Sequence, residues 1–146
     1  MGAFTALRIS ASALTAERLR MDVIANNIAN QQTTRAVNGK PYRRRVAVFV
    51  PLEAHRVLGR AQEVNRPLPD QMGVRVAAIV EDPRPGMRVY NPNHPDADAE
   101  GYVTYPNVDI VTEMVDMMSA ARAYEANLIA AQTAKQMALR ALDIGR

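Results

Sequence analysis

The sequence predicts an α+β fold in which long N- and C-terminal helices pack as a coiled-coil-like pair, with a small β-rich domain inserted between them. The first observation is that all nine prolines lie between Pro41 and Pro106. Proline lacks a backbone N–H and its ring clashes with the preceding helical turn, so long helices exclude it. The second is a heptad-like apolar pattern in both Pro-free ends. We therefore expect a terminal helical domain of residues 1–35 and 107–146 and an inserted domain of residues 36–106.

Apolar residues in the two Pro-free ends follow one another at alternating steps of three and four, interrupted only by Arg18 and Lys135. An isolated amphipathic helix has nothing to bury such a stripe against, so each helix must find another, within the chain or between chains. We expect subunit interfaces at Leu7, Leu14, Met21, Ile28, Ile110, Met114, Met117, Ala121, Tyr124, Leu128 and Leu142.

An Asn-rich segment, residues 25–35, follows the apolar stripe of the N-terminal helix. Asn tolerates the left-handed backbone conformation and hydrogen-bonds its own backbone, so an Asn cluster at this place is expected to end the helix.

Three strands are expected in the middle of the chain, at residues 42–52, 74–80 and 88–90, with turns at residues 65–70 and 83–86. Three arginines, Arg43 to Arg45, open the first strand. Alternation places Arg43 and Arg45 on one face and Arg44 on the other. We interpret this run as a solvated strand edge rather than a phosphate clamp, because nucleic-acid domains add more basic residues and stacking aromatic side chains.

An acidic segment, residues 96–101, has the opening pattern of a calcium-binding loop, with carboxylates at its first, third and fifth positions and Gly at its sixth. The twelfth position is Asn107, where such a loop requires a bidentate Glu, and no helix precedes the segment. The favoured interpretation is an acidic turn that leads into the C-terminal helix. This helix is expected to span residues 109–144, with Asn107 or Asp109 as its cap.

Composition and motifs argue against several classes of function. The chain has no Cys, which excludes disulfides, thiolate metal sites and Cys nucleophiles. His55 and His94 stand alone, and no phosphate-binding glycine loop or Gly-x-Ser-x-Gly elbow occurs. A membrane span and a conventional secretory signal are not expected. The net charge of +3 is modest for a nucleic-acid module. We expect no catalysis, no metal and no cofactor.

Several stretches together resemble the axial proteins of the bacterial flagellum, the rod and hook subunits. The Asn-rich segment is similar to the signature of that family, and its Thr-Thr-Arg ending at residues 33–35 looks like the proximal-rod branch. Other matching stretches are residues 42–45, 73–83, 91–103, 106–109, 113–118 and 141–146. The family-motif positions are Asn26, Asn27, Asn30, Thr33, Thr34, His94, Pro95, Asp96 and Asp98.

The resemblance implies a structural subunit of the proximal rod, in the flagellar basal body within the periplasm. Its terminal helices would assemble into a helical driveshaft that transmits torque. It also implies export through the flagellar type III apparatus without signal cleavage, and assembly with copies of itself and with FliE, FlgB and FlgF. The alternative function is a self-contained helical adaptor that binds a single protein partner; a nucleic-acid module and a small enzyme rank below it.

Overall fold

The computed structural model describes residues 3–52 and 72–144 as two long helices and four strands. Helix α1 spans Ala3–Ala29 and helix α2 spans Ile110–Ile144. Between them lie β1 (Arg45–Pro51), β2 (Val74–Glu81), β3 (Arg88–Tyr90) and β4 (Tyr102–Thr104). The predicted α+β class, with terminal helices flanking a β-rich segment, is confirmed. The turn expected at residues 65–70 and His55 lie outside the described residues.

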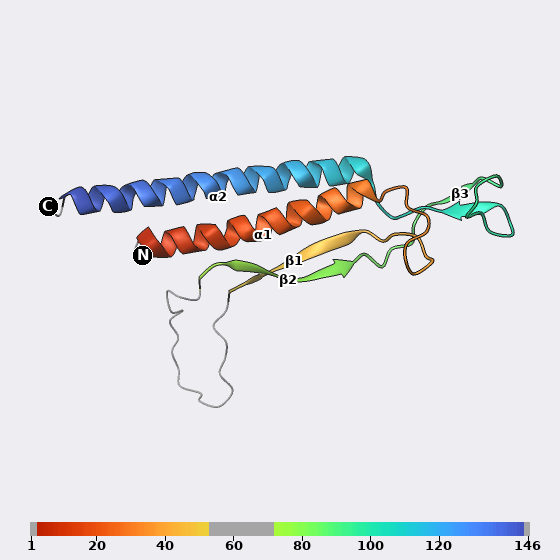
Figure 1. Cartoon of the computed structure of the whole chain (residues 1–146), viewed down its shortest axis with the longest axis horizontal. Helices are drawn as coiled ribbons and strands as arrows, with labels where there is room; N and C mark the ends of the chain where they lie inside the picture. The colour runs from red at the N-terminus through yellow and green to blue at the C-terminus, as the bar shows by residue number, and fades with distance from the viewer. Residues whose placement is uncertain (1–2, 53–71, 145–146) are drawn as a thin grey trace, which may run out of the picture.

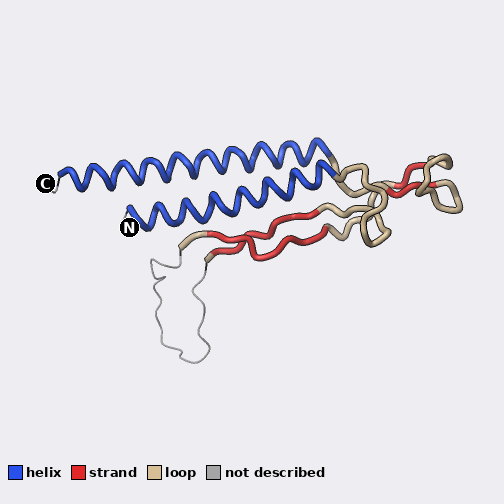
Figure 2. Tube along the Cα trace, in the orientation of Figure 1, coloured by secondary structure: helices blue, strands red, loops and turns tan. Residues whose placement is uncertain are grey.

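The molecule is elongated and has three layers along most of its length (Figure 1). The two helices run antiparallel, and α1 lies between α2 and the β1–β2 hairpin. The short β3–β4 hairpin lies beyond the end of the helix pair (Figure 2). With 35 residues, α2 is about 52 Å long, longer than the 27-residue α1. No helix in the described ranges has both the length and the apolar character that crossing a membrane demands.

The strands form two separate antiparallel pairs, β1 with β2 and β3 with β4. The β1–β2 register is interrupted after Val48, where one extra residue on β2 makes a bulge. The expected strands at 74–80 and 88–90 are present, and the first strand begins later than expected, at Arg45. Strand β4 was not predicted. It is only three residues long and follows directly on the acidic turn, yet its Val103 is fully buried.

The buried apolar residues are few and mostly small, so the helices approach each other through alanines. Ala16, Ala120 and Ala134 are buried, together with Val23 and Ile24. A thin core of this kind contributes little hydrophobic stabilisation, since the gain scales with the apolar area removed from water. Specific polar contacts therefore matter more to this fold than they do in a larger domain.

Helix α2 begins with an N-cap at Asp109. The Asp109 carboxylate accepts hydrogen bonds from the backbone N–H of Val111 at 3.2 Å and from the hydroxyl of Thr112 at 2.6 Å. These bonds lower the pKa of Asp109, and the bond from the Thr112 hydroxyl is the largest cause. Of the two expected caps, Asp109 is the one used, and Asn107 has a different role described below.

Replacing Asp109 by Ala is expected to lower the thermal unfolding midpoint, because α2 then starts with an unsatisfied donor. Asn at this position caps a helix about as well as Asp. Asp109→Asn is therefore the matched control and should leave the midpoint nearly unchanged in a circular-dichroism melt. If Asn and Ala lowered the midpoint equally, the cap would not be what Asp109 contributes.

Candidate functional site: a buried polar junction

A buried cluster of polar side chains joins α1, β1 and α2 at the end of the helix pair next to β3 and β4. We call it the polar junction and define it by Asn27, Tyr42, Arg44, Asn107 and Glu113. Asn27 and Glu113 are both 0% exposed. They come from the last turns of α1 and the first turn of α2, which the antiparallel pairing brings together.

Asn27 is at the centre of the junction and uses its full hydrogen-bonding capacity. Its side-chain Nδ2 donates to the carbonyl of Arg45 at 2.8 Å and to Oε2 of Glu113 at 2.9 Å. Its Oδ1 accepts from the backbone N–H of Arg45 and from the hydroxyl of Tyr42, both at 2.9 Å. The Asn27 amide bonds to both the N–H and the C=O of Arg45, as the backbone of a neighbouring strand would. Asn27 therefore holds the start of β1 against α1.

The buried carboxylate of Glu113 is paired on both oxygens. Nε of Arg44 donates to Oε1 at 2.5 Å, while Oε2 accepts from Asn27. The same guanidinium donates through its Nη2 to Asp116 at 3.0 Å. A charge removed from water is costly unless it is paired and hydrogen-bonded, so Arg44 is required for Glu113 to be buried at this place. The Tyr42 side chain in the same junction is buried too, and this burial raises the pKa of its hydroxyl above the ordinary value.

Asn107 ties the end of β2 and the approach to α2 into the same junction. Its Oδ1 accepts from the backbone N–H of Arg44 at 2.8 Å. Its Nδ2 donates to the carbonyls of Asp82 at 3.3 Å and Arg84 at 3.0 Å. The junction therefore connects both helices and both strands of the β1–β2 hairpin through side chains that fix backbone positions.

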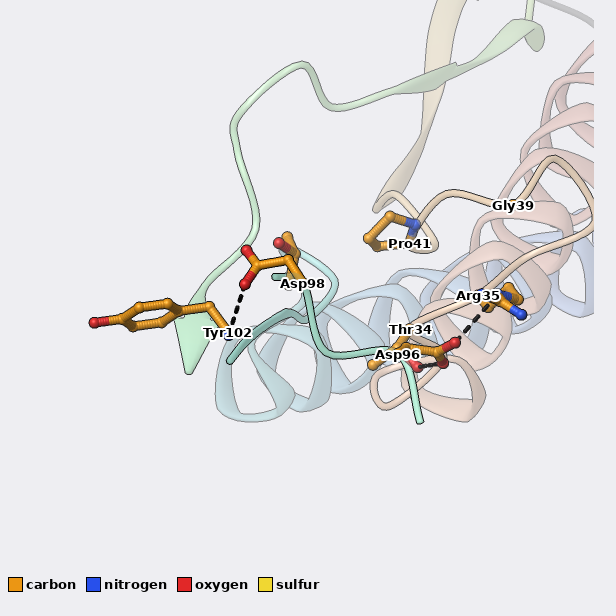
Figure 3. A pocket seen from close by; sticks show the side chains of 8 residues that line it. Thr34, Arg35, Gly39, Pro41, Asp96, Asp98 and Tyr102 are labelled. Atoms are coloured by element: carbon orange, nitrogen blue, oxygen red, sulfur yellow. Dashed lines mark hydrogen bonds and ion pairs between the residues drawn. The ribbon is translucent and has the colours of Figure 1, made fainter. Parts of the chain in front are cut away.

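A second polar cluster joins the chain after α1 to the turn between β3 and β4. Asp96 accepts from the hydroxyl of Thr34 at 2.8 Å and pairs with Arg35 at 3.1 Å (Figure 3). Its backbone N–H donates to Nδ1 of His94 at 3.1 Å. The lining residues, among them Thr34, Asp96 and Tyr102, surround a hollow of about 230 Å³.

The carboxylates of the calcium-like segment are occupied by donors from the protein itself. Asp98 accepts from the backbone N–H groups of Tyr102 at 2.8 Å and Glu100 at 3.0 Å, and from Arg88 at 2.6 Å. The bond from Tyr102 is the largest cause of the lowered pKa of Asp98. These contacts make the segment a turn that begins β4, which agrees in part with the expected acidic turn.

The structure refines one prediction and corrects another. The Asn-rich segment contains the end of α1, at Ala29, as expected, but no left-handed residue is used there, because no described residue other than Gly has a positive φ. Instead Asn30 donates through Nδ2 to the carbonyl of Asn26 at 2.9 Å, and Asn27 is inside the helix. The arginine run was expected to be a solvated edge, which is wrong for Arg44. Arg43 is exposed, whereas Arg44 is turned inward by Glu113.

The family-motif residues belong to these two clusters. Asn26 accepts from Asn30, and Thr33 donates to Asn30 at 3.2 Å. Thr34 donates to the Asp96 carboxylate, and the Asp96 backbone N–H donates to His94. Pro95 lies between His94 and Asp96 in the turn. The motif residues are therefore internal structural contacts in a single chain. The signal that could have found the remaining junction residues is the carboxylate of Glu113 placed among apolar residues early in α2.

The predicted interface residues divide into two groups. Leu7, Leu14, Met21, Ile28, Met117, Ala121 and Tyr124 are half-buried in the single chain, whereas Ile110, Met114, Leu128 and Leu142 are exposed. The face of α2 that meets α1 runs through the buried Glu113, Ala120 and Ala134. The predicted line of Met114, Ala121 and Leu128 is shifted by one residue along the sequence from this buried face. The assignment of these residues to subunit contacts stays a prediction.

Two family models match the chain. The model described as "Flagella basal body rod protein" matches residues 7–36, and the model described as "Flagellar basal body rod FlgEFG protein C-terminal" matches residues 99–144. The flagellar basal-body rod protein FlgC of Bacillus subtilis is 46% identical over 158 residues, with 100% of both chains covered. The chain belongs to the FlgC family. FlgC of Borreliella burgdorferi is 44% identical, covering 99% of this chain and 98% of its own.

Membership of the FlgC family makes this chain a structural subunit of the flagellar basal-body rod. FlgC of Escherichia coli O6:H1 is 41% identical over 94% of both chains. The two matched segments of this FlgC-family chain contain most of α1 and all of α2, and each supplies one of the fully buried junction residues, Asn27 or Glu113. These relatives are rod proteins rather than enzymes. In the described ranges no three potential metal ligands come together.

Asp82 lies beside the polar junction, and its carboxylate allows the stability of the fold in acid to be tested. The pKa of Asp82 is lowered from 3.8 to about 2, and the largest cause is hydrogen bonding from the Arg84 side chain. A folded-state pKa below the unfolded one gives stability that is present above the unfolded value and lost as the pH falls through the folded value. We expect stability to decrease between pH 4 and pH 2, with Asp98 and Asp109 acting in the same direction.

The measurement is urea unfolding at a series of pH values for the wild type and for Asp82→Asn. The Asn variant has no carboxylate to protonate at this position, so its stability should depend less steeply on pH below 4. Parallel curves for the two proteins would show that the Asp82–Arg84 pair makes no contribution to acid stability.

Proposed function

We propose that this rod subunit belongs to the proximal rod, where its terminal helices pack against neighbouring subunits to build the helical driveshaft that carries torque across the periplasm. The observation that supports this proposal is the amount of apolar surface that α2 leaves open. On α2 alone, the exposed large apolar side chains are those of Ile110, Val111, Met114, Val115, Met118, Leu128, Ile129, Met137, Leu139 and Leu142.

This surface follows from the layer order. Among the described helices and strands, α1 packs against α2 and against both strands of the hairpin, whereas the main packing partner of α2 is α1. An exposed apolar surface of this extent on a protein of this size marks an interaction site. Contacts that join different surfaces of identical subunits generate an open helical filament when the rotation between subunits does not close a ring, and a rod is such a filament.

The partners proposed for these surfaces are copies of the chain itself and the rod proteins FliE, FlgB and FlgF. The terminal helices, with residues 1–35 and 107–146, would form the rod core, and residues 36–106 would form an outer layer. The polar junction would hold these two parts in one fixed relation, because Asn27 and Glu113 in the helices bond to the segment that leads into β1.

The deciding experiment is complementation of a strain that lacks its own gene for this subunit. The full chain should restore swimming, and purified basal bodies should contain it in their rods. A chain that stays soluble in the cytoplasm, bound to one partner, would instead support the helical adaptor. Mass spectrometry of the same basal bodies tests export without signal cleavage through the type III apparatus.

We expect that mass measurement to find α1 retained. Ser12 accepts from the backbone N–H of Val74 at 3.1 Å, and Asn27 anchors both β1 and α2. Removal of about twenty residues, the length of a signal peptide, would uncover the hairpin and the inner face of α2. Rod protein missing the first half of α1 would contradict the proposed route.

A further inference from the structure

The second polar cluster holds the turn between β3 and β4 against the chain that follows α1. Strands β3 and β4 pair with each other beyond the end of the helix pair (Figure 2). In the described ranges, the hydrogen bond from Thr34 and the ion pair with Arg35 connect the segment after α1 to this turn, and both end on the carboxylate of Asp96 (Figure 3). The position of the β3–β4 hairpin relative to the helices therefore depends on how firmly the turn holds Asp96.

The ring of His94 shapes this turn. Its Nδ1 accepts a hydrogen bond from the backbone N–H of Asp96 at 3.1 Å. The backbone of His94 also donates to the carbonyl of Asn91 at 3.2 Å and accepts from the N–H of Ala97 at 3.0 Å, which closes the chain around the ring. A backbone N–H can only donate, so Nδ1 has to be the unprotonated nitrogen of a neutral imidazole. The turn in this form requires His94 to be uncharged.

The groups around the ring do not replace this hydrogen bond once His94 is protonated. The titratable or charged groups in and beside the turn are Asp96, Asp98, Arg35, Arg88 and Tyr105. Both carboxylates already have partners, because Asp96 pairs with Arg35 and Asp98 with Arg88. The Tyr105 ring lies edge-to-face with the imidazole, 6.4 Å away between ring centroids. A protonated Nδ1 would point its hydrogen at the N–H of Asp96, so the ring has to turn away and the bond is lost.

We propose that His94 is a pH-sensitive latch, whose protonation releases the Asp96 N–H, loosens the turn and frees the β3–β4 hairpin from the segment after α1. Histidine is the side chain that ordinarily gains its proton between about pH 5 and pH 8. The latch is closed above this range and opens as the pH falls through it, because only the neutral ring accepts the bond. The latch belongs to the single chain and does not rest on the proposed rod function.

Amide hydrogen exchange of the purified full chain, followed by NMR, measures the latch directly. From pH 7.5 to pH 5.5 the protection of the Asp96 amide should fall by about tenfold, after correction for the intrinsic pH dependence of exchange. Tenfold is roughly the factor by which an ordinary histidine loses its neutral form over this range. The matched control is His94→Asn, since an Asn side chain can accept the N–H two residues later and does not titrate. In this variant the protection should stay constant. His55→Asn, which removes the other histidine, should behave as the wild type does.

Release of the hairpin is measured separately with a pair of spin labels, and the natural absence of Cys gives a clean background. Val37→Cys places one label in the segment after α1 and Ala99→Cys places the other in the β3–β4 turn, both at exposed positions. The distribution of distances between the labels should be narrow at pH 7.5 and broad at pH 5.5. With His94→Asn added, it should be narrow at both pH values.

Three results would overturn the inference. Constant protection of the Asp96 amide in the wild type, or an equal loss in His94→Asn, would show that the ring of His94 does not control the turn. A loss of protection without broader label distances would show that the turn does not hold the hairpin. An equal loss at the amides of α1 and α2 would indicate unfolding of the whole chain rather than a local latch. All these measurements use the purified chain, so none of them decides whether it builds rods.

Discussion

Asn27→Asp is expected to reduce the free energy of unfolding by about 3–5 kcal/mol, a large part of the stability of a domain this small. The change removes the donor that Asn27 presents to the Arg45 carbonyl and to Glu113, 2.8 and 2.9 Å away. It also places two carboxylates side by side in a site that is 0% exposed. Among the described residues, one guanidinium, that of Arg44, is bonded to Glu113, and its single positive charge cannot neutralise both carboxylates.

The pH dependence of Asn27→Asp gives a second signature. Two adjacent buried carboxylates raise each other's affinity for a proton, so one of them should have a raised pKa in the folded variant. The penalty then applies above that pKa and is relieved as the pH falls through it. In urea unfolding followed by circular dichroism, the difference between the variant and the wild type should narrow from pH 8 to pH 5.

Asn26→Asp is the matched control, one residue earlier on the exposed side of the same helical turn. It keeps the Oδ1 that accepts from Asn30 and Tyr42, and its added charge stays in water. We expect a change within about 0.5 kcal/mol. Equal losses from both variants would mean that the polar junction is not what stabilises this end of the molecule.

The sequence was sufficient for both helices and for β1, β2 and β3, but not for β4, because the signals of the former are local. The restriction of proline to the middle of the chain predicted both helices, and alternation between faces predicted β1, β2 and β3.

The side of α2 that packs against α1 was harder to predict from the apolar stripe. Met117, Tyr124 and Ala131 belong to two adjacent heptad lines, one continued by Ala120 and Ala134 and the other by Ala121 and Leu128. Periodicity alone does not say which line meets α1, and burial shows that it is the first.

The polar junction could not be predicted because its contacts join residues far apart in the sequence. Asn27 and Glu113 are 86 residues apart, and Arg44 and Glu113 are 69 apart. Each of these residue types is mostly exposed in proteins, so the default interpretation of the arginine run was a solvated strand edge. The family resemblance pointed to Asn27, but not to the four bonds that its amide makes.

Leu128→Asp is expected to abolish rod completion and swimming while leaving the isolated chain folded. Leu128 is 40% exposed in the single chain, so a carboxylate there remains hydrated and should change the free energy of unfolding by less than about 1 kcal/mol. In an assembled rod the same carboxylate would be buried against a neighbouring subunit without a partner, which costs several kcal/mol at every repeat of the contact. The measurements are motility in soft agar and the yield of complete rods in purified basal bodies.

Glu125→Gln is the control for Leu128→Asp, because it changes the charge of an exposed residue less than one turn away and leaves the apolar surface intact. It should swim normally. Met117→Asp supplies the opposite case, since Met117 is half-buried within the chain itself and its carboxylate should destabilise the monomer as well as the rod. If Leu128→Asp swam as well as Glu125→Gln, this face of α2 would not be an assembly surface. Rod contacts would then have to be sought on the hairpin, where Val46, Val48 and Val80 are also exposed.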